Sequence, residues 1–157
     1  MVIEIGGYMI QFTEHVTNIL LGYIQNDKAK PEAGGILLGQ IKNKNVLINK
    51  VSFPSKQDKY SRYSFNRNKK KAQILIDYEF LNSNKKTVYF GEWHTHPEKN
   101  PSPSRKDKKM IKSQLTLNKL NEEFILQLIL GTEGYYLALW NLLESKKIEI
   151  KSKNLPF

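Results

Sequence analysis

Strand-forming runs alternate with segments of helical periodicity along most of the chain, and this alternation limits the possible folds more than any other feature of the sequence. The strand-like runs are rich in β-branched and aromatic residues, whereas the helical segments repeat apolar residues three or four positions apart. We predict helices over 14–25, 68–81 and 104–120, and strands over 8–13, 35–41, 46–53, 60–65, 87–93, 124–130, 135–142 and 148–150. Such a mixture favours a sheet flanked by helices over a bundle or a barrel. The expected fold class is α+β, a central β-sheet in a three-layer α/β/α arrangement.

The chain of 157 residues contains no linker, repeat or low-complexity tract that divides it. A chain of this length buries roughly 70% of its unfolded surface as one unit, so we expect a single domain over residues 1–157. Residues 1–12 include Glu4 and lack a basic leader or a cleavable apolar stretch. The longest apolar runs, 124–130 and 135–143, are too short and interrupted to cross a bilayer. The sequence predicts a cytoplasmic protein without membrane contact.

The absence of cysteine excludes disulfides, thiolate zinc fingers, iron–sulfur clusters and cysteine-protease chemistry. Any metal must therefore be held by histidine, aspartate or glutamate. The chain has only three histidines, His15, His94 and His96, so a zinc site with two histidines must be completed by a carboxylate. His15 lies at the start of the first predicted helix, and we interpret it as a surface or capping residue.

A formal net charge of +10 raises the question of nucleic-acid binding, because lysine-rich surfaces bind phosphates through counterion release. The excess is almost entirely lysine, and the only arginines are Arg62, Arg67 and Arg105. Recognition of phosphates and bases relies more on arginine forks. Lysine and asparagine are abundant throughout the chain, so we interpret the charge as a solvated surface and nucleic acid as the less favoured partner.

Two histidines at the end of a predicted strand form a candidate metal site. His94 and His96 are two positions apart, so in a strand they point to the same side and can converge on one ion. Asp107 is the candidate for the third zinc ligand, which leaves a fourth position for water. Ser104 and Asp107 stand three apart after a proline-rich loop, and this spacing by itself indicates only a helix-capping box.

Taken together, these residues resemble the signature of the JAB/JAMM (MPN) zinc metallopeptidase family. In that signature His-x-His is followed after seven residues by Ser-x-x-Asp, and every position from His94 to Asp107 matches. The upstream segment Glu-Ala-Gly-Gly-Ile-Leu-Leu-Gly, residues 32–39, resembles the family's early strand, which carries a glutamate before Gly-Gly and Leu-x-Gly. The resemblance covers roughly residues 14–142.

The resemblance implies a role for each matched residue. His94, His96 and Asp107 would bind Zn²⁺, Glu32 would accept the proton of the zinc-bound water, and Ser104 would hydrogen-bond the oxyanion of the tetrahedral intermediate. General chemistry is consistent with these roles, since zinc lowers the pKa of water toward ~7 and a nearby carboxylate can take up and deliver the proton.

Neighbouring residues have weaker interpretations. Glu92 shares the strand face of the histidines, so it is either a rival base or a partner of a ligand histidine, with a solvated edge carboxylate as the simpler alternative. Gly34 and Gly35 leave the backbone free of side chains, which would allow close approach of an extended substrate. Trp93 and Thr95 face away from the histidines and are expected in the core.

The segment 91–97, the Pro-Ser-Pro-Ser loop and the stand-alone size resemble the prokaryotic JAB deconjugating peptidases of CBASS antiphage operons, which accompany bacterial E1-like and E2-like enzymes. This implies cleavage of a peptide or isopeptide bond after the flexible C-terminal tail of a CD-NTase or ubiquitin-like protein. Such a tail can add as a strand to an exposed edge. We interpret Tyr60, Tyr63 and Phe65 as strand packing rather than as the lining of a substrate groove. Two alternatives stay open, a JAB peptidase that processes a sulfur-carrier precursor and a basic, non-catalytic, nucleic-acid-associated JAB-like module.

Overall fold

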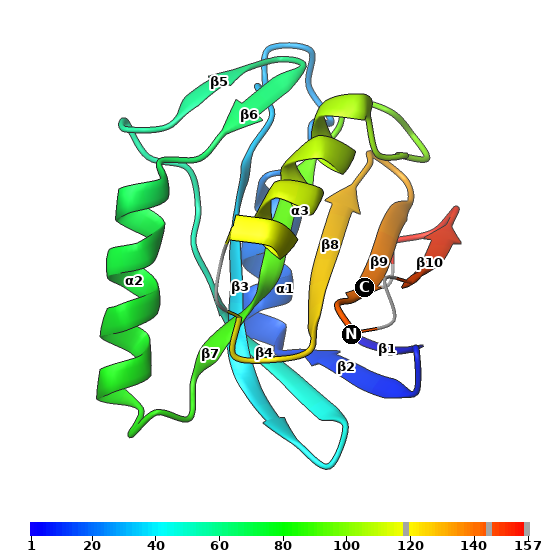
Figure 1. Ribbon diagram of the computed structural model, residues 1–157. Coiled ribbons are helices and arrows are strands. Elements are labelled where there is room, and N and C mark those ends of the chain that lie inside the picture. The colour runs from blue at the N-terminus through cyan, green and yellow to red at the C-terminus, as the bar shows by residue number, and fades with distance from the viewer. Residues whose placement is uncertain (118–119, 144–145, 156–157) are drawn as a thin grey trace.

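The computed structural model describes residues 1–117, 120–143 and 146–155, and its centre is a mixed β-sheet (Figure 1). Within these residues the sheet has eight strands in the order β1-β2-β4-β3-β7-β8-β9-β10, and β5 and β6 form a separate two-stranded sheet. The strands are Val2–Ile5 (β1), Tyr8–Phe12 (β2), Gly34–Lys42 (β3), Asn45–Val51 (β4), Lys59–Ser61 (β5), Ser64–Asn66 (β6), Val88–Thr95 (β7), Phe124–Leu130 (β8), Tyr135–Asn141 (β9) and Lys146–Ser152 (β10). The helices of the described residues are Glu14–Gly22 (α1), Lys69–Asn82 (α2) and Arg105–Leu117 (α3). None of them combines the length and apolar character needed to cross a membrane. The predicted α+β class is confirmed.

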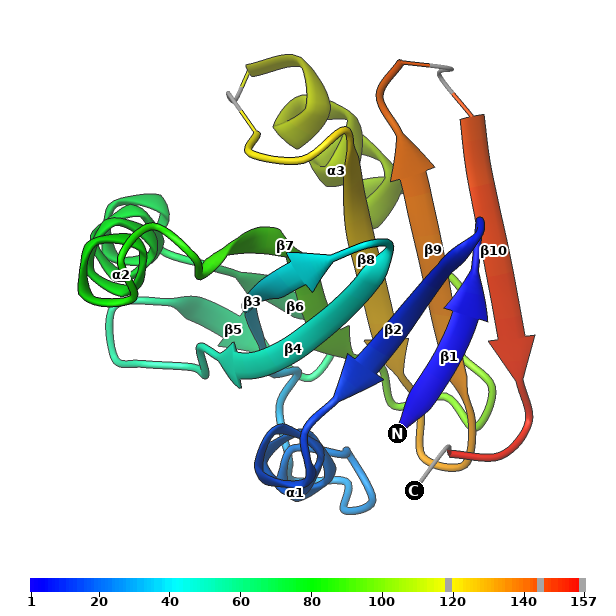
Figure 2. The same ribbon diagram turned by 90° about the horizontal axis from the view of Figure 1, so that it is seen from below.

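The helices cover both faces of the sheet. Val16 of α1 lies in one apolar core with Leu37 and Phe90, whereas Ile111 of α3 lies in a second core with Ile36. Successive residues of a strand point to opposite faces, so the change of core between residues 36 and 37 places the two cores on opposite sides of β3. Figure 2 shows α1 on one side of the curved sheet and α2 and α3 on the other. The layers are therefore helix, sheet and helix.

The observed ends of the helices follow from local hydrogen bonds. The Thr13 side chain accepts a hydrogen bond from Val16 N–H at the start of α1, and the Asn68 side chain accepts one from Lys71 N–H at the start of α2. The prediction that the first helix continues to residue 25 is wrong, because the chain leaves the helix after Gly22. The last part of the third predicted helix, residues 118–119, lies outside the described residues.

Two features of the strands differ from the prediction. The run 60–65 is not one strand but the hairpin of β5 and β6, in which Tyr60 pairs with Phe65 and Ser61 with Ser64. Its turn has no glycine, proline or asparagine, so the alternating pattern gave no sign that the chain reverses there. Strand β1 was not predicted either, although Gly6 and Gly7 form the turn that joins it to β2, both with positive φ.

Gly34 and Gly35 of β3 are surrounded by the chain itself. A Cβ atom on Gly35 would lie 2.0 Å from the carbonyl oxygen of Ser52, and one on Gly34 would lie 2.6 Å from Cδ1 of Phe65. The space predicted for an extended substrate at these glycines is therefore filled by Ser52 and Phe65.

Gly35→Ala is expected to lower the free energy of unfolding by about 1–3 kcal/mol, the usual range for overpacking. Ser52 cannot move away easily, because its N–H donates to the Ile36 carbonyl and its hydroxyl oxygen accepts from Ile36 N–H. Gly22→Ala is the control, since a Cβ there meets nothing within 4 Å. Urea unfolding measures both variants. Equal stability of the two would contradict the close packing of Gly35 against Ser52.

Candidate functional site

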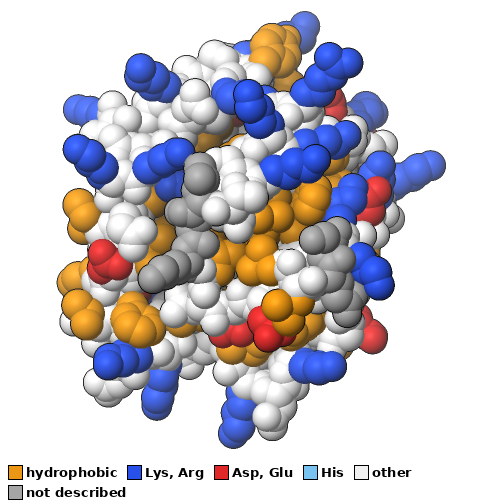
Figure 3. Space-filling view, in the orientation of Figure 1, with side chains coloured by type: hydrophobic (Ala, Val, Ile, Leu, Met, Phe, Trp, Pro, Cys, Tyr) orange, Lys and Arg blue, Asp and Glu red, His pale blue; other side chains and the backbone are white. Residues whose placement is uncertain are grey.

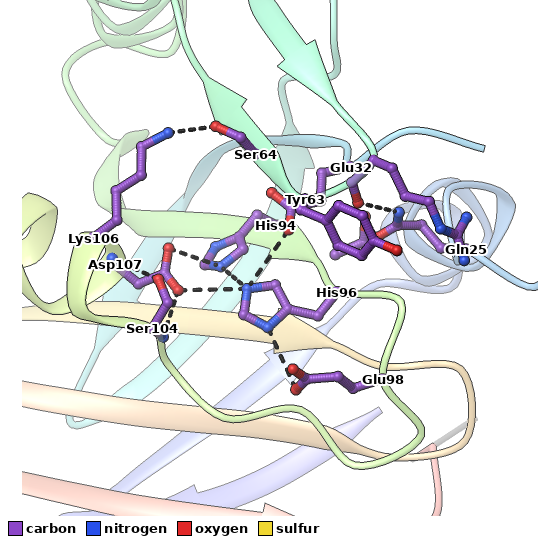
Figure 4. Close-up of polar contacts among 12 residues, drawn as sticks. Gln25, Glu32, Tyr63, Ser64, His94, His96, Glu98, Ser104, Lys106 and Asp107 are labelled. Atoms are coloured by element: carbon purple, nitrogen blue, oxygen red, sulfur yellow. Dashed lines mark hydrogen bonds and ion pairs between the residues drawn. The ribbon is translucent and has the colours of Figure 1, made fainter. Parts of the chain in front are cut away.

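His94, His96 and Asp107 converge where β7 ends and α3 begins (Figure 4). The Nε2 atoms of the two histidines are 3.1 Å apart, and each lies 3.4 Å from a different carboxylate oxygen of Asp107. One possible ligand atom from each residue falls within 4.8 Å of the others. His94 lies in β7, and His96 is the first residue after β7. The two histidines are two positions apart, so the alternation of the extended backbone directs both rings to the same side. Two nitrogens and one oxygen thus face a single point.

Asp107 reaches this point from the first turn of α3 and also caps the helix. The Ser104 N–H donates to Oδ2 of Asp107 at 2.7 Å, and the Asp107 N–H donates to Oγ of Ser104 at 3.2 Å. This reciprocal pair is a capping box. The capping and ligand interpretations of Ser-x-x-Asp are therefore compatible, because the same carboxylate fixes the helix start and faces both histidines.

Glu32 lies immediately before β3 and is 7% exposed. Its Oε1 is 4.0 Å from Nε2 of His96, and its N–H donates to the Ser61 carbonyl at 2.8 Å. Burial raises the pKa of Glu32 to about 7, although the nearby His96 acts in the opposite direction. A carboxyl group with a pKa near neutrality is suited to accept and return a proton.

The carboxylate of Asp107 favours positive charge on the neighbouring His96. Burial alone would raise the pKa of Asp107, but hydrogen bonds from His94 and His96 hold it far below its usual range. Burial alone would lower the pKa of His96, but the hydrogen bond and charge of Asp107 raise it. The carboxylate of Asp107 therefore favours the protonated form of His96, and a metal ion bound there would have to displace that proton.

Glu92 lies on the strand face that alternation predicts, but it is not a solvated edge carboxylate. It is 3% exposed, and Arg67 binds its two oxygens through Nε at 3.0 Å and Nη2 at 2.5 Å. The Tyr89 hydroxyl donates to the same carboxylate at 2.7 Å. The interpretation as a solvated carboxylate is wrong, and both oxygens are engaged in a buried ion pair. No pattern in the sequence indicated Arg67 as its partner, which lies in the segment between β6 and α2.

A cavity of about 460 Å³ opens over the cluster, and the β5–β6 hairpin forms one of its walls. Tyr63, at the turn of the hairpin, is 74% exposed and lines the cavity together with Phe65. Lys106 of α3 donates a hydrogen bond to the hydroxyl of Ser64, which links the hairpin to the helix that carries the aspartate. The interpretation of these aromatic residues as simple strand packing is therefore wrong for Tyr63. His15 lies exposed in α1, as predicted.

Comparison with known proteins identifies the family. Residues 13–142 match the sequence profile of the family described as prokaryotic homologs of the JAB domain. The chain belongs to this family. Three curated relatives of this JAB chain are named "CD-NTase/cGAS isopeptidase". The protein from Vibrio cholerae is 32% identical over 79% of this chain and 77% of its own length. Those from Pseudomonas aeruginosa and Escherichia coli are 29% and 33% identical, over 83% and 76% of this chain and 82% and 74% of their own lengths.

A solved structure agrees with the fold of this JAB chain. A protein from Desulfitobacterium hafniense, known from a solution structure, superposes with a TM-score of 0.62, covering 94% of this chain and 92% of that one. The two sequences are only 18% identical, so the likeness concerns the fold.

Proposed function

We propose that this JAB chain is a zinc-dependent isopeptidase that cleaves after the C-terminal tail of a CD-NTase or ubiquitin-like partner and so reverses its conjugation in antiphage defence. The names of three relatives, CD-NTase/cGAS isopeptidase, support the substrate class. The observation that carries the proposal is the placement of a buried carboxyl group beside a cluster of metal-binding side chains. Glu32 lies 4.0 Å from His96, which itself faces His94 and Asp107.

The donor set suits zinc. Zinc takes imidazole nitrogens and carboxylate oxygens, and catalytic sites commonly use three protein ligands with one position left open. His94, His96 and Asp107 provide two nitrogens and one oxygen within 4.8 Å of one another. A zinc ion held there would supply a Lewis acid that polarises a carbonyl group and makes water more acidic.

The remaining chemistry falls to two side chains. Glu32 takes the proton from the attacking water and passes it to the leaving amine, a role that suits its pKa of about 7. Ser104 Oγ accepts a hydrogen bond from Asp107 N–H, which leaves its own hydroxyl hydrogen to donate to the oxyanion that forms on the substrate carbonyl. Acid–base transfer and oxyanion stabilisation are thus assigned to separate residues.

The β5–β6 hairpin offers a place for the substrate tail. Ser64 and Asn66 of β6 line the cavity, and in the described residues β6 pairs only with β5. An unpaired strand edge accepts an extended peptide through backbone hydrogen bonds and requires little of its side chains. A flexible tail laid along β6 would pass Tyr63 and bring its last peptide bond toward Glu32 and the histidines.

The surface charge leaves nucleic-acid binding as a second candidate function. On the face shown in Figure 3, lysine and arginine side chains are scattered between polar and apolar ones rather than gathered in a stripe. A protein that follows a phosphate backbone is expected to concentrate its basic side chains on one face or along one helix. Helix α3 does carry five exposed basic residues, Arg105, Lys106, Lys108, Lys109 and Lys112, so nucleic-acid binding stays the second candidate.

A fusion of a CD-NTase tail to a reporter protein is expected to be cut directly after the tail. A chelator should stop the reaction and added zinc should restore it, because the proposed chemistry needs the ion. Cleavage is measured by gel electrophoresis and mass spectrometry, with a sulfur-carrier fusion in parallel. Cutting of the sulfur-carrier fusion alone would change the proposed substrate. An intact fusion beside protein that retards DNA at physiological salt would refute the peptidase proposal in favour of a nucleic-acid-associated module.

A further inference from the structure

Gln25 is a buried polar residue that the proposed chemistry does not use. It lies beyond the end of α1, is 2% exposed and lines no part of the cavity wall. Its Nε2 donates to the carbonyl oxygens of Lys30 at 3.2 Å and Arg62 at 3.0 Å, and its Oε1 accepts from the Thr95 hydroxyl at 3.2 Å. Both amide hydrogens and the amide oxygen therefore have partners, and these partners lie on three different segments.

The Thr95 hydroxyl connects Gln25 to the loop that carries the proposed base. Thr95 stands between the two histidines, and its Oγ1 accepts a hydrogen bond from Ala33 N–H at 3.0 Å. Its own N–H donates to the Ala33 carbonyl at 2.9 Å. On the other side, the Glu32 N–H donates to Ser61 of β5 at 2.8 Å. The backbone around Glu32 is thus hydrogen-bonded to β7 and to the hairpin. Gln25 contacts both places, because it binds Thr95 of β7 and Arg62, the residue after Ser61.

Arg62 strengthens the same arrangement from the turn of the hairpin. Its Nη1 donates to the carbonyl oxygens of Asp27 at 3.1 Å, Lys28 at 2.6 Å and Lys30 at 3.4 Å. The Lys30 carbonyl therefore receives hydrogen bonds from both Arg62 and Gln25. In the view of Figure 4, Gln25 and Asp107 lie on opposite sides of the histidine pair.

We propose that Gln25 is a positioning residue for Glu32. Its amide joins three segments, the loop before β3, the hairpin turn and the strand that carries the histidines, and so sets the distance between the Glu32 carboxyl and His96. The inference rests on the proposed role of Glu32 as the base. A fully paired buried network fixes one arrangement, whereas removal of the amide leaves the Lys30 and Arg62 carbonyls without this donor and lets the loop shift. A displacement of about 1 Å at a reacting group can cost about 10²-fold in rate.

Gln25→Met tests the proposal, because methionine has a similar length and no hydrogen-bonding amide. We expect kcat for the tail fusion to fall by about 10²-fold, with KM and zinc content little changed. The matched control is Gln127→Met. Gln127 is also a fully buried glutamine, but its amide oxygen accepts from Trp140 and no partner among the described residues is found for its Nε2, so its replacement should leave kcat unchanged. An equal loss of kcat in both variants would mean that Gln25 acts through general stability, and the proposal would fall.

Thr95→Val removes the hydroxyl between Gln25 and Ala33 while keeping the side-chain volume. Its kcat should fall in the same way, and the double variant with Gln25→Met should lose little more than either single one, because both changes break one network. If Gln25→Met does not fold, the kcat of Thr95→Val alone tests whether this hydrogen-bond network positions Glu32. Additive losses in the double variant would contradict a shared network.

Hydrogen exchange provides a readout that needs neither zinc nor substrate. In Gln25→Met the amides of Glu32 and Ala33 should exchange about tenfold faster than in the wild type, as expected when a supporting hydrogen bond is lost, while the amides of β8 stay unchanged. If the wild-type protein does not cut the fusion, the proposed function fails, and the exchange rates still decide whether Gln25 holds this loop. Unchanged exchange at both amides would overturn the proposal.

Discussion

Glu32→Gln is expected to lower turnover of a tail fusion by about 10²–10⁴-fold while zinc stays bound, the usual contribution of a general base. Glutamine keeps the volume of the side chain but cannot take a proton from water. Glu32 is buried and its Oε1 lies 4.0 Å from Nε2 of His96. The measurement is turnover at saturating zinc beside the metal content of the purified variant.

Glu92→Gln is the comparison that separates the two buried carboxylates near the histidines. Arg67 and Tyr89 hold both oxygens of Glu92, so its replacement should leave turnover close to that of the wild type. The cost should appear in the free energy of unfolding, up to about 3–5 kcal/mol, because a buried arginine loses its counter-charge. A zinc-loaded but inactive Glu92→Gln beside an active Glu32→Gln would reverse the assignment of the base.

Parts of the cluster of His94, His96 and Asp107 could be predicted from sequence because their geometry is local. Two histidines two positions apart on a strand must face the same side, and an aspartate three positions after a capping serine must lie in the first helical turn. The structure brings His94, His96 and Asp107 together, a meeting that the resemblance to the family implied and that the local spacing alone does not require. Glu32 is different, because it lies 62 positions before His94 in the chain, and only the resemblance to a family linked them.

What the sequence did not reveal depends on pairing between distant segments. Alternation placed Glu92 on the correct strand face but could not show that Arg67 would lie against it. The turn of the β5–β6 hairpin has no residue that marks a reversal, so Tyr63 was assigned to a strand and its place over the cavity was missed. The sequence pattern placed Gln25 in the first helix, but α1 ends at Gly22. The buried contacts of Gln25 depend on the loop after α1 packing against the turn of the β5–β6 hairpin.

Asp107→Ala is expected to remove most of the zinc, a larger loss than the roughly 10–100-fold drop in affinity that follows loss of an outer partner of a ligand. Two histidine nitrogens alone leave the ion with one protein ligand fewer than catalytic zinc sites usually have. Because Asp107 also caps α3, the variant loses a capping contact as well, and helix stability must be separated from metal binding.

Ser104→Ala provides that separation, because it removes the hydroxyl half of the capping box and leaves the aspartate in place. Both variants should lose about 1 kcal/mol of stability, the typical contribution of a helix cap. Only Asp107→Ala should lose zinc, whereas Ser104→Ala should keep the ion and lose about 10²–10³-fold in kcat, as expected for one oxyanion donor. Metal analysis and turnover of the two proteins give both results. If Asp107→Ala kept all its zinc, Asp107 would act only as a helix cap. Glu32 would then be the nearest buried carboxylate that could serve as the third ligand beside the two histidines, and it could no longer be the general base.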